Sequence, residues 1–344
     1  MKPLDISERF LIYVTEQSLL VSLTSLIALS LNIKAVFLGF FLSYKVSFVE
    51  GFLHIFDTYS GLLNILILFS LSLFYYFFGS VTNLGISQSL FKVKIISKYL
   101  IPDGKLLTTL LIRDVIKAFF ISNFINSLFV LRNRKFLQSL YDYKFQLITL
   151  KNGEDTKRTL FFQYLLASLI SYYSIFFILL IIYVFITPVA PLVSGTTTTN
   201  ASFNYWNFFN TVLRNNITLD ISQYIIGGFS LFTGTFVILF YSNILETTFM
   251  ASLNSGPHAS SFVKYILPQF FPETMGYVFG IAISMVITDI MLSYIQSMAR
   301  NQKSEYFFNR AKELVINAGY YFILSIVLLV IGAIIEASLG VLNF

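Results

Sequence analysis

The stretch Leu160–Thr187 reads LFFQYLLASLISYYSIFFILLIIYVFIT and contains no charged residue. Crossing the ~30 Å hydrocarbon core of a bilayer takes roughly 20 apolar residues in a helix. In lipid, only a helix or a closed barrel satisfies every backbone group. The apolar residues here run continuously instead of alternating, which favours a helix. We therefore predict a membrane-spanning helix, and three more at Ser60–Phe78, Met275–Met298 and Tyr320–Leu342.

The composition agrees with a membrane protein. The chain is 56% hydrophobic and 12% charged, whereas a soluble domain is roughly 25% charged. There is no cysteine, which excludes disulfides, thiolate metal sites and cysteine nucleophiles. We expect an all-α, polytopic helical integral membrane protein with roughly 5–7 membrane helices plus re-entrant or interfacial segments. A first helix is expected at about Phe10–Leu31.

Lysine and arginine set the predicted topology, because cytoplasmic loops carry an excess of both. The net charge of +6 fits this pattern, and no nucleic-acid motif is present. The basic segments Ser80–Lys105 and Arg132–Arg158 should both be cytoplasmic, as should the N-terminus. The apolar residues 106–131 between them then cannot cross once, so we expect a re-entrant segment, a short hairpin or an interfacial helix. Residues 188–220 would be extracytoplasmic.

Motifs of the N-terminal half follow one another in a characteristic order. An arginine and a glutamate two helical turns apart share one face of the first helix, and a Gly/Thr segment, a Leu-Arg and a basic run ending at an aspartate follow. This order resembles the RDD family of bacterial membrane proteins over about residues 7–150. Glu16 stands where that family has Asp, and Ile86 where it has Lys. The matching residues are Arg9, Glu16, Thr82, Gly85, Arg113 and Asp142.

The C-terminal half resembles the stage II sporulation protein M family over about residues 211–340. An Asn-Asn precedes a glycine-rich helix, a Leu-Pro precedes a glutamate, and a closing helix carries a second glutamate. Gln269 and Phe270 replace the His-Gly pair of that family. The matching residues are Asn215, Asn216, Asn243, Pro268, Glu273 and Glu336. The two resemblances predict two membrane domains, 1–150 and 160–344, joined by a polar linker at 151–159.

The resemblances imply a multi-pass protein of the bacterial cytoplasmic (inner) membrane. Some RDD proteins are described as cation/proton antiporters. The sporulation protein is a membrane partner of cell-wall hydrolases, and its relatives occur beside MoxR-type ATPases and von Willebrand A-type proteins. We therefore expect a non-catalytic scaffold that docks such partners in a cell-envelope complex. The alternative is a secondary transporter or channel for a cation or small solute, proton-coupled through intramembrane carboxylates.

Carboxylates in apolar helices are the candidates for an ion or proton path, because they are costly in lipid and usually face protein or water. They are Glu16, Asp289 and Glu336. Each could instead form an internal salt bridge that fixes helix packing, as Arg9 with Glu16 would. Glu273 follows Pro272 at an expected helix start, where the helix dipole favours a carboxylate.

The remaining polar candidates have structural alternatives. Arg132, Arg134 and Lys135 could contact membrane lipid phosphates or a protein partner, or could simply set the topology. The asparagines could join helices, and the glycines of Gly227–Gly234 could pack helices closely, including between subunits of a homo-oligomer. His54 and His258 form no metal motif. No nucleophile–base motif, metal site or cofactor site is found, so we do not expect an enzyme.

Overall fold

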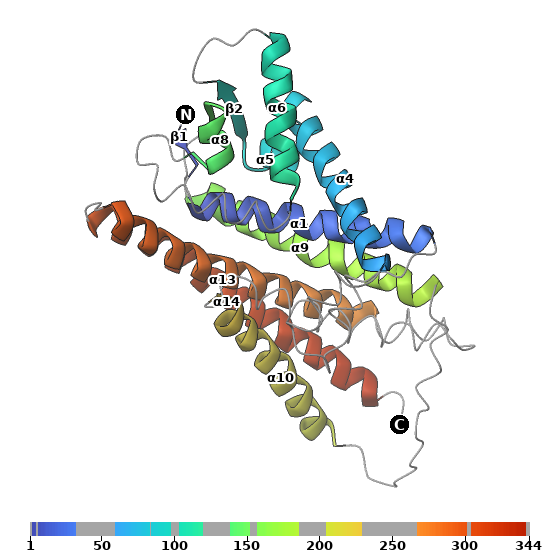
Figure 1. Cartoon of the computed structure of the whole chain (residues 1–344). Helices are drawn as coiled ribbons and strands as arrows, with labels where there is room; N and C mark the ends of the chain where they lie inside the picture. Colours follow the sequence, from blue (N-terminus) through green and yellow to red (C-terminus); the bar gives the residue numbers. More distant parts are fainter. Residues whose placement is uncertain are drawn as a thin grey trace. The chain divides into compact units, whose positions relative to one another are not determined.

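The computed structural model describes residues 2–4, 6–31, 59–82, 84–97, 103–119, 138–151, 157–185, 204–228, 267–300 and 304–341 (Figure 1). The chain forms two compact units. Unit 1 comprises Met1–Ser171 and Asp289–Leu314, and unit 2 comprises Tyr172–Thr288 and Val315–Phe344. The division into domains 1–150 and 160–344 stays a prediction.

Most of the described residues are helical, as predicted. Among them, the stretches long and apolar enough to cross a membrane are Glu8–Ala28, Tyr59–Ser89, Pro268–Ala299 and Phe307–Ser338. They lie in or begin with α1 (Ile6–Ser30), α4 (Tyr59–Thr82), α13 (Leu267–Arg300) and α14 (Ser304–Val341). The predicted first helix and three of the four predicted spans therefore coincide with such helices. The fourth span is helical in α9 (Lys157–Phe185), and its crossing stays a prediction, as does the total of 5–7.

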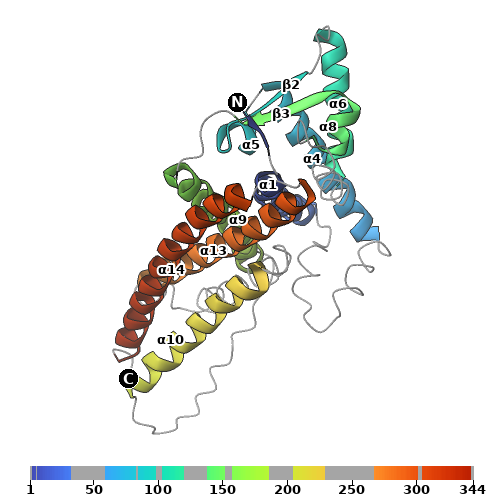
Figure 2. The same ribbon diagram turned by 90° about the vertical axis from the view of Figure 1, so that its left-hand side faces the viewer.

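A small antiparallel sheet adds to the predicted all-helical architecture. It contains β1 (Lys2–Pro3), β2 (Val93–Ser97) and β3 (Leu147–Lys151) in the order β1-β3-β2, and Figure 2 shows β2 beside β3. Val93 pairs with Lys151, and Ile95 pairs with Thr149. The strand sequences VKIIS and LITLK are rich in β-branched residues, which favour the extended conformation.

Short helices connect this sheet to the long ones. The helix α5 (Ile86–Ser89) precedes β2, and α8 (Leu140–Lys144) precedes β3. Ser139 begins α8 and accepts a hydrogen bond from the Asp142 amide. Gln146 takes a left-handed conformation, with φ 59°, where the chain turns from α8 into β3. This turn brings α8 and the start of β3 side by side.

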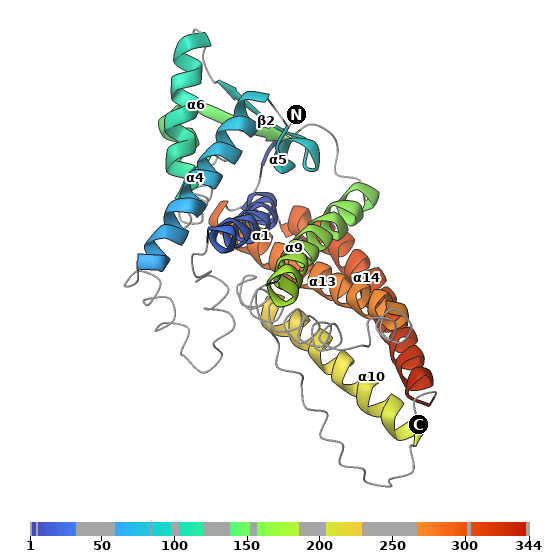
Figure 3. The same ribbon diagram turned by 90° about the vertical axis from the view of Figure 1, so that its right-hand side faces the viewer.

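The helix α6 (Asp103–Ala118) occupies the first part of the predicted re-entrant or interfacial segment. It lies beside α4 (Figure 3), and the rings of Phe69 and Phe119 have centroids 4.8 Å apart. Leu20 of α1, Leu68 of α4 and Ala118 of α6 form one buried apolar cluster. Residues 120–137 lie outside the described part, so the choice between a hairpin, a re-entrant segment and an interfacial helix stays open.

In unit 2, three glycines of α13 and α14 receive side chains from neighbouring helices. A Cβ on Gly276 would lie 2.7 Å from Leu329, and one on Gly332 would lie 2.5 Å from Glu273. A Cβ on Gly280 would lie 1.9 Å from Oδ1 of Asp220, a residue of α10 (Tyr205–Ser222). The absence of a side chain at these positions therefore allows α10, α13 and α14 to pack closely.

We expect Gly280→Ala to lower the free energy of unfolding by about 1–3 kcal/mol, because the added methyl group overlaps the Asp220 carboxyl. The matched control is Gly319→Ala on α14, where a Cβ would meet nothing within 4 Å. That change should be neutral or stabilising by about 0.5–1 kcal/mol, since alanine favours a helix over glycine. Thermal unfolding in detergent measures both. Equal effects of the two substitutions would show that Gly280 does not pack as described.

Candidate functional site

Asp142 lies at the centre of a buried ionic cluster in unit 1. Its Oδ1 accepts a hydrogen bond from Nε of Arg113 at 2.7 Å, and its Oδ2 lies 3.3 Å from Nη1 of Arg9. The Thr149 hydroxyl also donates to Oδ2, at 2.8 Å. Arg113 forms a second ion pair with Asp114 at 2.6 Å. Two carboxylates therefore face two guanidinium groups, and the four charges balance.

Four elements supply this cluster. Arg9 comes from α1, Arg113 from α6, Asp142 from α8 and Thr149 from β3. Asp142 is fully buried, while Arg9 and Arg113 keep only 8% and 3% of their surface exposed. The ring of Tyr141 lies 5.3 Å from the Arg113 guanidinium carbon, which adds a cation–π contact.

The electrostatics of the cluster favour charged groups. Burial alone would raise the pKa of Asp142, but the charges of Arg113 and Arg9 and the hydrogen bonds from Arg113 and Thr149 outweigh it. The pKa of Asp142 therefore falls to about 2. Burial would likewise lower the pKa of Arg113, but the Asp142 and Asp114 charges raise it above its ordinary value. These groups stay ionised at neutral pH and act as an internal tie between elements.

Glu16 forms a second polar group beside the cluster. Its Oε2 lies 3.8 Å from Nζ of Lys117, and its Oε1 accepts a hydrogen bond from the Tyr75 hydroxyl at 3.2 Å. The Tyr75 oxygen in turn accepts a hydrogen bond from the Ile86 amide at 2.8 Å. The Lys117 ammonium lies 3.8 Å from the centre of the Tyr76 ring. Glu16 therefore forms an internal ion pair, but its partner is Lys117 and not Arg9 as expected. Arg9 pairs with Asp142 instead.

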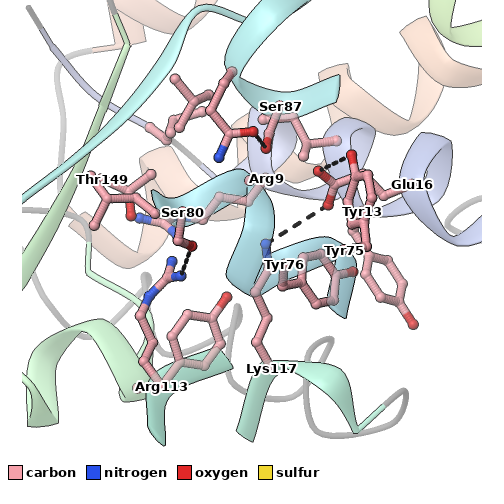
Figure 4. Close-up of a pocket in the computed structure, with 17 residues that line it drawn as sticks. Arg9, Tyr13, Glu16, Tyr75, Tyr76, Ser80, Ser87, Arg113, Lys117 and Thr149 are labelled. Carbon is pink, nitrogen blue, oxygen red and sulfur yellow. Dashed lines mark hydrogen bonds and ion pairs between the residues drawn. The ribbon is translucent and has the colours of Figure 1, made fainter. Parts of the chain in front are cut away.

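A cavity of about 50 Å³ lies between these groups (Figure 4). By volume it has room for a few water molecules. Arg9, Arg113 and Lys117 line it together with Glu16, and Asp142 and Asp114 neutralise the two arginines from behind. The site as a whole therefore carries no excess charge that would select an anion or a cation.

Of the residues that carry the RDD resemblance, Arg9, Glu16 and Arg113 line this cavity. Arg9, Arg113 and Asp142 form the ionic cluster. Thr82 donates to the Phe78 carbonyl at 2.7 Å and accepts from the Leu84 amide at 3.3 Å, which ends α4. A Cβ on Gly85 would lie 2.3 Å from Oε1 of Gln88. Thr82 and Gly85 therefore shape the turn between α4 and α5.

Asp289, the second candidate for an ion path, has a positively charged partner within unit 1. Its carboxyl lies 3.1 Å from Nη2 of Arg310 and accepts hydrogen bonds from the hydroxyls of Tyr164 and Ser293. The sequence places no basic residue in either helix core near it, yet Arg310 reaches it from near the start of α14. A packing role explains these contacts.

In unit 2, Glu273 of α13 contacts Glu336 of α14, the third path candidate. Glu273 lies against Gly332, one turn before Glu336 on α14, and the two carboxyl groups interact electrostatically. Asn216 of α10 donates to Oε1 of Glu273 at 3.0 Å and accepts a hydrogen bond from the Tyr277 hydroxyl at 3.1 Å. Because α13 begins at Leu267, Glu273 lies in its second turn and not at its start, which corrects the expected helix-dipole role.

Asp220, which the sequence analysis did not single out, lies close to this pair. It is fully buried, and its Oδ2 accepts hydrogen bonds from the hydroxyls of Tyr224 and Ser325. Its Oδ1 has no hydrogen-bond partner among the described residues, nor has either amide atom of Gln223. Gln223 begins η2 (Gln223–Gly227), one turn of π-helix, a distortion that often marks functional sites.

Polar side chains thus gather in two neighbouring groups on α10, η2, α13 and α14, one around Glu273 and one around Asp220, which together we call the polar seam. Its members are Asn216, Asp220, Gln223, Tyr224, Glu273, Tyr277, Ser325 and Glu336. Burial raises the pKa of Asp220 to about 7, although the hydrogen bonds from Ser325 and Tyr224 act in the opposite direction. α10 is not among the candidate membrane spans.

Several predicted residues take no part in these sites. Asn215 and Pro268 are exposed on the surface of unit 2. Asn243, Arg132, Arg134, Lys135, His54 and His258 lie outside the described residues. The predicted asparagine contacts between helices are therefore represented by Asn216.

Comparison of the chain with protein-family models, with curated proteins and with solved structures finds no match. The resemblances to the RDD and sporulation M families therefore stay predictions.

We expect Asp142→Asn to lower the free energy of unfolding by about 3–5 kcal/mol, because it removes the buried carboxylate that the guanidinium groups of Arg9 and Arg113 both face. In the wild type, the stability from Asp142 is complete above its ordinary pKa of 3.8 and is lost as the pH falls towards about 2. Thermal unfolding in detergent against pH measures both effects. Lys144→Gln on the exposed side of the same helix is the control, with an expected change within about 0.5 kcal/mol. A loss of stability in Asp142→Asn no larger than that of the control would contradict a stabilising role of the ionic cluster.

Asp220→Asn should have the opposite pH dependence. The raised pKa means that the wild type loses stability as the pH rises from 3.8 to about 7, because the unfolded chain releases its proton first. The asparagine side chain has the shape of the protonated carboxyl group and does not ionise. The variant should therefore not lose stability as the pH rises. We expect equal thermal stability of the two proteins in acid and a more stable variant above neutral pH. A variant that is less stable above neutral pH would contradict a neutral Asp220.

Proposed function

We propose that the chain is a non-catalytic multi-pass membrane protein that acts as a secondary transporter or channel for a cation, with the polar seam as part of its path. The observation that carries this proposal is the proximity of two carboxyl groups, because Glu273 lies against Gly332, one turn before Glu336 on α14. Two carboxylates that lie close together repel each other when both are ionised. A proton or another cation bound between them would remove this repulsion.

The location of the pair supports this role. Glu273 and Glu336 belong to two candidate membrane spans, where a carboxyl group is costly and usually faces protein or water. Asn216 and Tyr277 present polar groups on the same side. A cation that leaves the pair would have the hydroxyls and amides of the polar seam along its way. Glu16 and Asp289, in contrast, each have a basic partner and fit a structural role better.

The scaffold function rests on other residues. Its expected docking residues, Arg132, Arg134 and Lys135, lie outside the described part of the chain, so the MoxR-type or von Willebrand A-type partners stay a prediction. Localisation in the bacterial inner membrane with a cytoplasmic N-terminus is part of the same proposal. The apolar helices are compatible with a membrane protein.

In proteoliposomes, Glu336→Gln should reduce cation flux at least about tenfold, because the amide cannot take up or release a cation at neutral pH. Flux is followed with a pH-sensitive dye inside the vesicles and with sodium or potassium gradients across them. The matched control is Glu313→Gln on the same helix α14, which should keep the wild-type flux. Full flux through the Glu336 variant would refute a path through this pair.

A further inference from the structure

The two oxygens of the Asp220 carboxyl have different surroundings. Oδ2 accepts from two hydroxyl groups, those of Tyr224 and Ser325. Oδ1 faces Gly280: a Cβ built on that glycine would lie 1.9 Å from Oδ1 and 2.7 Å from Oε1 of Gln223. Both of these oxygens are buried and lack hydrogen-bond partners among the described residues. Both oxygens act only as acceptors, and a proton on Asp220 would supply a donor for Oε1 of Gln223.

The charges around Asp220 lead to the same result. Among the described residues, no lysine, arginine or histidine forms an ion pair with it. Tyr224 is the titratable group that faces it from η2, α14 faces it with Ser325, and α13 faces it with Gly280. Glu273, two turns before Gly280 on α13, adds a carboxyl and no positive charge. An ionised carboxylate in such surroundings pays a large desolvation cost that no counter-charge offsets.

We propose that Asp220 is a proton-binding site of the polar seam, with the protonated carboxyl donating to Oε1 of Gln223 and the ionised form held by Tyr224 and Ser325. Each form then has its own hydrogen-bond partners, so the group can gain and lose a proton without a change in the fold. With the Gln223 amide turned over, Nε2 would instead donate to an ionised Asp220. The two arrangements differ in the charge of Asp220, which is measurable.

The position of Asp220 connects this site to the proposed function. Asn216 and Asp220 are four residues apart and lie on one face of α10, and Asn216 contacts Glu273. Ser325, which donates to Asp220, also lies 3.1 Å from the Gly276 carbonyl, one turn from Glu273 on α13. A proton released from Asp220 is therefore about one to two helical turns from Glu273. The inference rests on the proposed function for its role in transport and names the proton as the coupling ion.

Infrared difference spectroscopy of the purified full-length protein in detergent, titrated with pH, tests the proton directly. The wild type should lose a signal of a protonated carboxyl group as the pH rises through about 7, and Asp220→Asn should lack this signal. Ser325→Ala and Tyr224→Phe each remove a donor to the ionised form, so each should move the midpoint upward by about one pH unit. The control Ser338→Ala changes an exposed serine of the same helix and should leave the midpoint in place.

An unchanged titration in Asp220→Asn would overturn the proposal, as would an Asp220 that stays ionised throughout. A signal that disappears on addition of sodium chloride at constant pH would show a metal cation in place of the proton, and would overturn it too. These outcomes are independent of transport. A titrating Asp220 in a protein whose flux ignores Glu336→Gln would support the site and refute the proposed function. If flux requires Glu336 but Asp220 does not titrate, the proposed function would be supported and the proton site at Asp220 refuted.

Discussion

Unit 1 depends on the requirement that a buried charge have a partner of opposite sign. The Asp142 carboxylate meets this requirement for Arg113 and Arg9 together, and through them it joins α8 to α6 and α1. Thr149 adds β3 to the same group. The sheet also buries Val93, Leu147 and Ile148, and the ion pairs add to this apolar packing in fixing its strands relative to the helices. Removal of one member would leave its partners charged in a low-dielectric interior.

Unit 2 meets the same constraint in a different way. Its carboxyl groups face hydroxyls, amides and each other, and Glu273 with Glu336 shows this most directly. In such surroundings a bound proton or cation would remove the repulsion between ionised carboxyl groups. The buried acids of unit 1 connect elements through ion pairs, and those of unit 2 carry the proposed path.

The long helices could be predicted because an uninterrupted apolar run is a local property of the sequence. Partners could not, since Arg9 and Asp142 are 133 residues apart and nothing local relates them. Strand β3 was missed because LITLK is short and lies beside a polar segment. Asp220 was missed because residues 188–220 are polar enough to resemble a loop, while its spacing to Tyr224, four residues later, was a signal of a helical face. The sequence suggested an ion pair between Arg9 and Glu16, whereas Arg9 pairs with Asp142 and Glu16 with Lys117.

The three glycines that receive side chains on α13 and α14 limit how unit 2 can move. Leu329, Asp220 and Glu273 each fit against a backbone position where no Cβ stands in the way. Because these side chains pack directly against the backbone of a neighbouring helix, they oppose translation of one helix along another. A rotation of the helices together keeps the same contacts. A helix can therefore slide only after one of these side chains leaves its glycine. Two of the three side chains, those of Asp220 and Glu273, are acids. The charge on those acids would then decide when the helices are free to slide.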